Sequence, residues 1–85
     1  MRFEDFYINK KLKEEGNLID GLKDGIWKEY YPSGKIKVLK NYCQGEKHGI
    51  FEFYKETGEL DFKVHYHFGR VKISNLKIRR LDFLG

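Results

Sequence analysis

An internal repeat runs through this chain, and its regular period constrains the fold more than any other feature of the sequence. When the sequence of 85 residues is shifted by 24, glycines align with glycines, in the pairs Gly21–Gly45, Gly45–Gly69, Gly25–Gly49 and Gly34–Gly58. Aromatic and aliphatic positions between the glycines align as well. We therefore predict one domain with four segments: a half-repeat (1–13), two full repeats (14–37 and 38–61) and a degenerate capping repeat (62–85).

Within each repeat the residues follow the pattern of a β-hairpin. In LDFKVHYHF, residues 60–68, apolar side chains alternate with polar ones, which is typical of a half-buried strand. The glycine-bounded turns DGLKDG and QGEKHG follow such strands, and glycine supplies the positive φ that tight hairpins need. We predict an all-β fold, an antiparallel meander of six to eight strands at roughly 2–8, 11–19, 25–31, 35–43, 49–55, 59–68 and 71–80.

The alternation also predicts which side chains form the core. The expected members are the apolar half of 60–68 and four residues of the earlier repeats: Leu60, Phe62, Val64, Tyr66, Phe68, Ile36, Val38, Trp27 and Phe51. Both faces of the strand at 25–31 carry rings. We therefore expect a curl of the sheet, a terminus or a partner to cover part of the second face.

Length and composition exclude several classes of protein. The single cysteine rules out an internal disulfide and suits a reducing compartment. No apolar run is long enough to cross a membrane, and the first residues, MRFEDFYINKK, lack the apolar core of a secretory signal. We therefore expect a cytoplasmic location. The chain is also too short for a large α/β enzyme fold.

The sequence shows no constellation that would support catalysis or bind a cofactor or metal. His65 and His67 share a strand face, and Cys43 is equivalent to His67 in the preceding repeat, but a structural zinc site needs four ligands. We interpret the two histidines as the polar half of an alternating strand. Cys43 has no paired base, the carboxylates are scattered, and the glycine turns match no phosphate-binding motif. We predict a protein that is not an enzyme.

Charge is distributed unevenly along the chain. The net charge is +4, but residues 62–85 alone hold six basic side chains and one acidic side chain. A basic end of this kind can contact nucleic acid, an anionic lipid surface or an acidic protein. It is also typical of a solvated edge that blocks aggregation between sheets.

The repeat resembles the variant MORN (membrane occupation and recognition nexus) repeat over residues 3–70. The segments that carry the resemblance are EEGNLIDGLKDGIWKEYYPSGKIK and KNYCQGEKHGIFEFYKETGEL. The chain departs from the family pattern at His48, where an aspartate is usual, and at Ile73, where a turn glycine is usual. The resemblance implies an elongated or curled all-β sheet with a binding role. Many bacterial proteins with this variant are labelled antitoxin components, and the wider family is associated with lipid contact and protein scaffolding.

These observations favour a non-enzymatic module that binds another protein, as a small antitoxin or an inhibitor of a toxin or defence nuclease, of bacterial or phage origin. We expect its binding residues to be Tyr31, Phe53, Lys72, Lys77, Arg79 and Arg80. Of the rings in the two full repeats, we expect Tyr31 to be the exposed one, compared with Trp27, Tyr30, Phe51, Phe53 and Tyr54. Nucleic-acid or anionic-lipid binding through the basic C-terminal residues is the alternative, and oligomers could form through the sheet edges.

Overall fold

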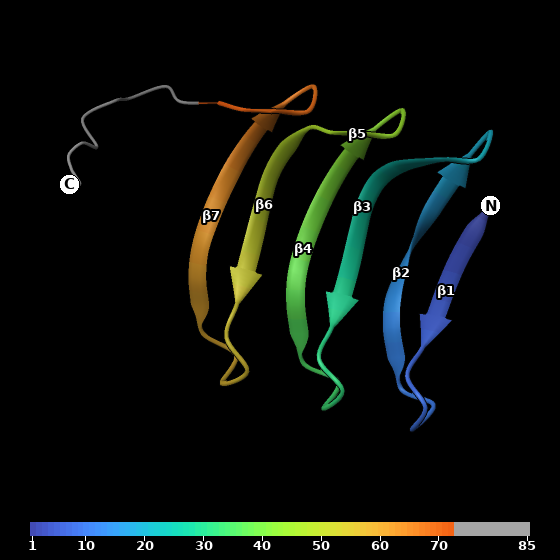
Figure 1. Ribbon diagram of the computed structural model, residues 1–85, viewed down its shortest axis with the longest axis vertical. Coiled ribbons are helices and arrows are strands. Elements are labelled where there is room, and N and C mark those ends of the chain that lie inside the picture. Colours follow the sequence, from blue (N-terminus) through green and yellow to red (C-terminus); the bar gives the residue numbers. More distant parts are fainter. Residues whose placement is uncertain (73–85) are drawn as a thin grey trace.

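The computed structural model describes residues 1–72, which form one antiparallel sheet of eight strands (Figure 1). The strands are β1 (Arg2–Phe6), β2 (Leu12–Ile19), β3 (Leu22–Tyr30), β4 (Ile36–Cys43), β5 (Glu46–Lys47), β6 (Gly49–Tyr54), β7 (Leu60–His67) and β8 (Arg70–Val71). They lie in the order β1-β2-β3-β4-β6-β7-β8, and β5 pairs with the end of β4. The prediction of an all-β meander is confirmed. Residues 1–72 contain no helix that could span a membrane.

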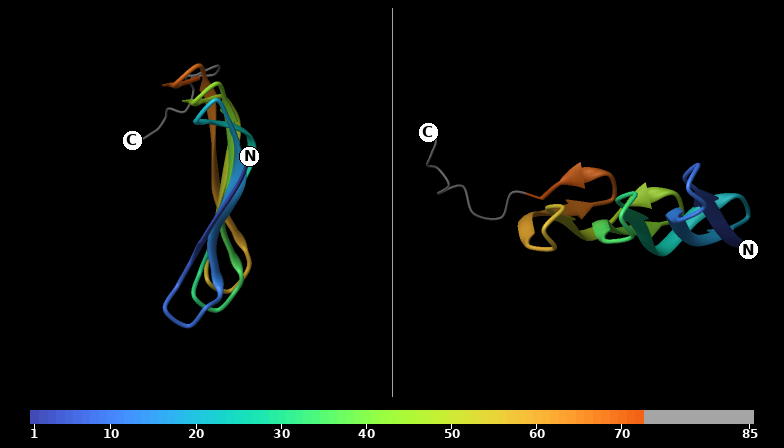
Figure 2. Two further views of the ribbon diagram at one scale, coloured as in Figure 1. Left: turned by 90° about the vertical axis from the view of Figure 1, so that its right-hand side faces the viewer. Right: turned by 90° about the horizontal axis from the view of Figure 1, so that it is seen from below.

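The sheet is a single layer. Its principal extents are 42 × 33 × 14 Å, and a second sheet would add about 10 Å to the shortest of them. Figure 2 shows the strands edge-on as one thin, twisted ribbon. Every strand therefore has two faces without a covering layer, and burial must come from neighbouring side chains on the same face.

Three tight hairpins of the described chain line one end of the sheet, at the top of Figure 1. Each has two central residues with positive φ, as in a type I′ turn. The pairs recur with the period of the sequence repeat: Asp20–Gly21 (φ 52° and 80°), Gln44–Gly45 (49° and 88°) and Phe68–Gly69 (44° and 88°). The type I′ turn suits the right-handed twist of the strands that it joins.

Three longer turns line the opposite end, and they recur with the same period. In each, the amide of the fourth residue donates to the carbonyl of the first: Lys10 to Tyr7 (2.8 Å), Gly34 to Tyr31 (2.8 Å) and Gly58 to Lys55 (2.9 Å). The fourth residue has positive φ, and the strand register shifts just before the turn. This is a type I turn followed by a left-handed residue. Lys10 occupies the position that glycine holds in the two later turns.

The core is smaller than the alternation predicts. Within residues 1–72, three apolar side chains are buried, Trp27, Val38 and Phe51, and they share one face of β3, β4 and β6. The expectation for Leu60, Phe62 and Phe68 is wrong, because these side chains are about half exposed. Leu60 and Phe62 lie in β7, and on the side of β7 away from β6 the described residues place only the two-residue strand β8. Phe68 lies in a tight turn.

Three predicted strands differ from the structure. The strand expected at 2–8 ends at Phe6, because the turn begins at Tyr7. The strand expected at 25–31 begins earlier, at Leu22, because the preceding turn uses only Asp20 and Gly21. Gly25, expected to close that turn, instead lies inside β3 with φ 78°. The strand expected at 71–80 is represented by β8, and residues 73–80 lie outside the described part of the chain.

Candidate binding surface

Five aromatic rings form a ladder along one face of the sheet, and this ring ladder organises the whole surface. Its members, in spatial order, are Phe3, Trp27, Tyr42, Phe51 and Tyr66. Successive centroids are 5.4, 6.3, 5.6 and 4.8 Å apart, within the range at which tilted and edge-to-face rings attract one another. Trp27 is only 1% exposed, and its indole N–H donates to the carbonyl of Asn17 at 3.1 Å.

Gly16 makes room for the largest ring of the ladder. A Cβ atom added at Gly16 would lie 2.0 Å from Cδ2 of Trp27, so the indole lies directly on the glycine backbone. A shift by one repeat takes Gly16 to Lys40 and Trp27 to the smaller ring of Phe51. The glycine therefore occurs where the larger indole crosses β2.

Lysine side chains cover the ladder at the spacing of the repeat. The Lys23 ammonium lies 4.7 Å from the Trp27 ring and 5.0 Å from the Tyr42 ring. Lys47, the equivalent residue of the next repeat, lies 5.0 Å from the Tyr66 ring. These distances are typical of cation–π contacts. The lysine side chains therefore shield the rings from solvent without a second protein layer.

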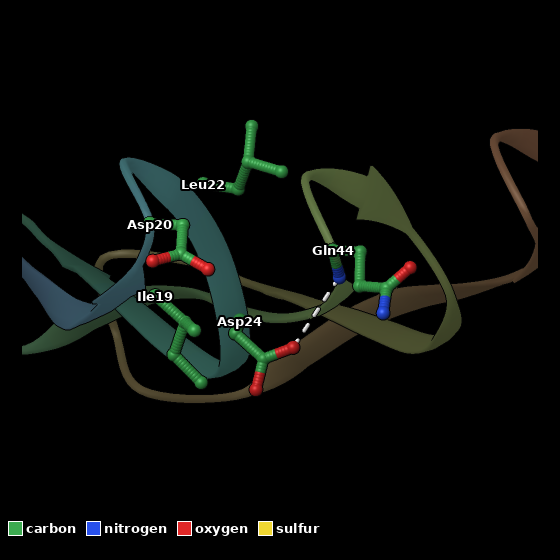
Figure 3. A pocket seen from close by; sticks show the side chains of 5 residues that line it. All are labelled: Ile19, Asp20, Leu22, Asp24 and Gln44. Atoms are coloured by element: carbon green, nitrogen blue, oxygen red, sulfur yellow. Dashed lines mark hydrogen bonds between the residues drawn. The ribbon is translucent and has the colours of Figure 1, made fainter.

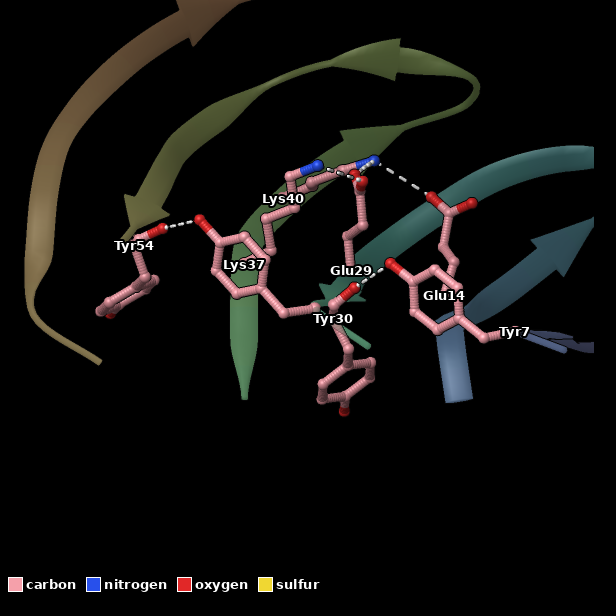
Figure 4. Close-up of polar contacts among 8 residues, drawn as sticks. Tyr7, Glu14, Glu29, Tyr30, Lys37, Lys40 and Tyr54 are labelled. Carbon is pink, nitrogen blue, oxygen red and sulfur yellow. Dashed lines mark hydrogen bonds and ion pairs between the residues drawn. The ribbon is translucent and has the colours of Figure 1, made fainter. Parts of the chain in front are cut away.

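A cluster of charged side chains continues the same face toward the longer turns (Figure 4). The Lys40 ammonium lies 3.0 Å from Glu14 and 2.9 Å from Glu29, and Lys37 lies 3.6 Å from Glu29. Burial acts to raise the pKa of the Glu29 carboxyl, but the hydrogen bonds and charges of Lys40 and Lys37 outweigh it and hold the pKa below 4.5. Burial likewise acts to lower the pKa of Lys40, yet its two carboxylate partners raise it above 10.5.

The opposite face carries a phenol whose ionisation is also shifted. Tyr30 hydrogen-bonds to the Glu15 carboxylate. Burial and this negatively charged acceptor raise the pKa of Tyr30 to about 12. The neutral phenol is favoured because its proton is shared with Glu15.

Two tyrosine hydroxyls tie successive repeats together (Figure 4). The Tyr7 hydroxyl donates to the carbonyl of Tyr30 at 2.6 Å, and the Tyr31 hydroxyl donates to the carbonyl of Tyr54 at the same distance. The two donors are one repeat apart, and so are the two acceptors. The prediction that Tyr31 is exposed is wrong, because the side chain is half-buried and this bond holds it against the next repeat.

A shallow hollow of about 300 Å³ lies beside the tight hairpins (Figure 3). It is lined by Ile19, Asp20, Leu22, Asp24 and Gln44. One carboxylate oxygen of Asp24 is already engaged, since its Oδ1 accepts a hydrogen bond from the Gln44 amide at 3.3 Å. The hollow is therefore part of the contact between two hairpins.

The same hairpin contact explains the departure of His48 from the family pattern. His48 is the equivalent of Asp24 in the next repeat, and its Nδ1 accepts a hydrogen bond from the Phe68 amide at 3.1 Å. Its ring also stacks on the Phe68 ring at 4.2 Å between centroids. Histidine thus supplies the acceptor that aspartate supplies in the preceding repeat.

The remaining sequence-predicted residues are only partly brought together. Phe53 is half-buried and stacks on Phe62, with centroids 4.6 Å apart and planes 12° from parallel. Lys72 is exposed beyond β8. The other three basic residues, Lys77, Arg79 and Arg80, lie outside the described residues.

Two residues that we assigned to the core are instead exposed near the end of the sheet. Leu60 is 45% exposed and Phe62 is 50% exposed. Phe62 stacks on Phe53, and we call this pair of rings the β6–β7 patch. Strand alternation places Leu60 and Phe62 on one face, but the register shift between Phe53 and Tyr54 pairs Leu60 with Tyr54 and separates it from Phe62. The decay of the repeat after Gly69 is the sequence signal that could have revealed the exposure.

The histidines and the cysteine do not assemble into a metal centre in the described part of the chain. His67 lies near His48, with ring centroids 5.2 Å apart, while Cys43 is a half-buried free thiol. Residues 1–72 contain no group of three or more potential ligands close enough to hold a metal ion.

A single-layer repeat sheet with a ring ladder and inter-repeat ties is the architecture of a β-repeat binding module. The sequence profile described as MORN repeat variant matches residues 23–44 and 47–67, about half of the chain. The chain therefore belongs to the MORN repeat variant family. MORN repeats generally mediate binding to proteins or membranes. No curated protein and no solved structure matches the chain.

Proposed function

We propose that this chain is a non-enzymatic protein-binding module that acts as a small antitoxin- or inhibitor-like protein and blocks a toxin or a defence nuclease. The observation that carries the proposal is the β6–β7 patch. Its ring Phe62 is about half exposed and stacks on Phe53, whereas only three apolar side chains of residues 1–72 are buried. Exposed rings beside charged residues are typical of the anchors of protein interfaces.

The surroundings of the patch support a protein partner. Lys63 and Glu52 flank the patch from the opposite face with an ion pair of 3.7 Å, so the strand offers both apolar and charged groups. A single-layer sheet also exposes a wide and rigid surface relative to the number of its residues. Neither the ring ladder nor the charge cluster has an assembled group for proton transfer or nucleophilic attack.

Affinity capture with the tagged full chain, followed by calorimetric titration of the purified partner, tests the proposal. Phe62→Ser should weaken binding about tenfold or more, because interface rings contribute most of the binding energy. Ile26→Ser is the matched control, since Ile26 is as exposed as Phe62 but lies on the other face. If the captured partner is a toxin or nuclease, the wild-type chain should reduce its activity.

Two results would contradict this function. One is that no partner is recovered by the wild-type chain; the other is that the Phe62 and Ile26 variants bind equally well. Circular dichroism of both variants separates a loss of binding from a loss of fold.

The alternative function is nucleic-acid or anionic-lipid binding through the basic C-terminal residues. Its support is the charge of residues 62–85, of which only Lys63, Arg70 and Lys72 lie in the described region. Binding to phosphates releases counterions and is therefore strongly salt-dependent. Titrations against RNA, DNA and acidic vesicles at two ionic strengths test it, and no binding at low salt would exclude it.

A further inference from the structure

The two ends of the described sheet are complementary to each other. At one end, all five residues of β1 are exposed, and β1 pairs only with β2. At the other end, β7 pairs with β6 along its length, but with β8 only through Tyr66 and His67. Among the described residues, the outer edge of Leu60–Val64 therefore has no neighbouring strand.

The order of equivalent strands in the repeats indicates which strand would follow β7. Strand β7 is equivalent to β2 and β4, whereas β1 is equivalent to β3 and β6. In the chain, β2 is followed by β3 and β4 is followed by β6. A strand like β1 is therefore the neighbour that the outer edge of β7 would have if the array continued.

From these edges we propose that β7 of one copy pairs with β1 of a second copy, head to tail, so that the sheet continues from molecule to molecule. The proposal concerns self-association and goes beyond the protein-binding function proposed above; the charge variants that test it leave Phe62 of the β6–β7 patch unchanged.

The molecule contains two pairings of this kind, β2 with β3 and β4 with β6, which we call joints. Both give the same register for the proposed pairing. The β2–β3 joint places Glu14 opposite Glu29 and Glu15 opposite Lys28, and the β4–β6 joint places Val38 opposite Phe53 and Leu39 opposite Glu52. Shifted by whole repeats, each joint places Phe62 opposite Asp5 of the second copy and Lys63 opposite Glu4 of the second copy.

This register brings opposite charges together. The side chains of Lys63 and Glu4 are 53% and 47% exposed at the edges, and each also lies near an opposite charge of its own chain, Glu52 at 3.7 Å and Arg2 at 4.0 Å. Opposite charges that face each other across paired strands are favourable, and like charges in the same place are unfavourable. The pairing therefore depends on one charge contact that can be reversed experimentally.

The ring ladder would also continue across the joint. Tyr42 and Phe51 lie 5.6 Å apart across the β4–β6 joint, and the equivalent pair is Tyr66 and Phe3 of the second copy. Phe3 is 36% exposed and ends the ladder on the β1 side. The chain's own continuation lacks this ring, because Asn75 stands at the position of Phe3, Trp27 and Phe51.

The joint uses two different edges, so it does not close as a two-fold dimer does. A pair of copies still offers one β1 edge and one β7 edge, and association should therefore proceed beyond dimers as concentration rises. Backbone pairing of about five residues per strand is a form of strand addition, which supports a weak and reversible contact.

Sedimentation velocity of the full chain between about 10 µM and 1 mM tests the proposal, a range suited to weak interfaces. The wild-type protein should show a weight-average mass that rises with concentration. Glu4→Lys alone and Lys63→Glu alone should each raise the dissociation constant about tenfold, because like charges then meet at the joint. Lys35→Glu and Glu56→Lys, both in exposed turns, are the charge-matched controls and should sediment as wild type.

An equimolar mixture of the two single variants gives the decisive result. Every mixed joint again pairs opposite charges, so the mixture should associate like wild type, and the double variant should associate by itself. Circular dichroism and the emission of Trp27 confirm that each variant is folded. A wild-type protein that stays monomeric at the highest concentration, single variants that associate like wild type, or a mixture that stays monomeric would each overturn the proposal.

Discussion

At the scale of single residues, the contact between Gly16 and Trp27 sets the tightest constraint on the sequence. A methyl group at position 16 would overlap the indole, and the sheet has no second layer into which the ring could move. Gly16→Ala should lower the free energy of unfolding by about 2 kcal/mol, in the range of overpacked sites. Urea denaturation followed by circular dichroism measures the loss.

A double-mutant comparison identifies the cause of that loss. In a Trp27→Phe background the smaller ring leaves more space above position 16; in the next repeat the corresponding residues are Phe51 and Lys40. Gly16→Ala should then cost less than half as much. An equal loss in both backgrounds would show that the alanine acts elsewhere, for example on the strand backbone.

Lys10 offers a stabilising substitution. Its φ of 71° lies in the left-handed region that favours glycine, and glycine stands at the equivalent positions 34 and 58. Lys10→Gly should raise the free energy of unfolding by about 1 kcal/mol, because a side chain in this conformation is strained by roughly that amount. Gly34→Ala, the reverse change in the matching turn, should lower it by a similar amount. Thermal and urea denaturation of both variants check the sign.

Residue-level chemistry was only partly predictable from the sequence. The spacing of the repeat assigned His48 to the position of Asp24 but could not show that both accept a backbone hydrogen bond. In the sequence, Lys40 interrupts the apolar alternation of Ile36, Val38 and Tyr42. In the structure, it joins Glu14 and Glu29 across two strand boundaries. Such partners come from neighbouring strands, and periodicity within one strand contains no information about them.

At the scale of strands and turns, the tyrosine ties hold each repeat to the next. The Tyr31 hydroxyl satisfies the Tyr54 carbonyl close to the turn between β6 and β7. Tyr31→Phe should lower the free energy of unfolding by about 1 kcal/mol, the usual contribution of one part-buried hydrogen bond.

Tyr42→Phe is the control for this substitution. It removes the same hydroxyl from a ring of the ladder, and within residues 1–72 no hydrogen bond of that hydroxyl is found. A loss that is equal for the two variants would contradict the role of Tyr31 as a tie. Hydrogen exchange of the β6–β7 turn amides should increase only in Tyr31→Phe.

Elements were more predictable than their ends. The strands expected at 11–19, 35–43, 49–55 and 59–68 lie within one residue of β2, β4, β6 and β7. The start of β3 was misplaced because each turn contains two glycines, and the sequence does not show which of them closes the hairpin. The structure assigns Gly21 to the turn and Gly25 to the strand.

At the scale of the whole molecule, a single layer leaves most of the stability to local joints between repeats. Strand contacts join only neighbours in the sheet, and each neighbour is also near in sequence. Repeat proteins of this kind behave as a row of units whose interface energies add up. The charge cluster Glu14–Lys40–Glu29 spans β2, β3 and β4, so its ionisation should affect the central joints together.

The stability of the molecule should therefore be highest between about pH 5 and pH 10. Because folding lowers the pKa of Glu29, its contribution is present above the unfolded value of about 4.3 and is lost as the pH falls through the folded pKa. Because folding raises the pKa of Lys40, and of Tyr30 to about 12, their contributions are present below about pH 10 and are lost as the pH rises.

Lys40→Met separates this cluster from the other charges of the chain. At pH 7 the variant should be about 1 kcal/mol less stable, because Glu14 and Glu29 are left facing each other without their shared cation. It should also lose less stability than wild type between about pH 5 and pH 3, since the pKa of Glu29 is no longer held down by Lys40. Lys55→Met, in an exposed turn, is the matched control. Urea denaturation across this pH range measures the free energy of unfolding of each variant. If wild type and Lys40→Met lose the same free energy of unfolding between about pH 5 and pH 3, the cluster does not govern acid stability.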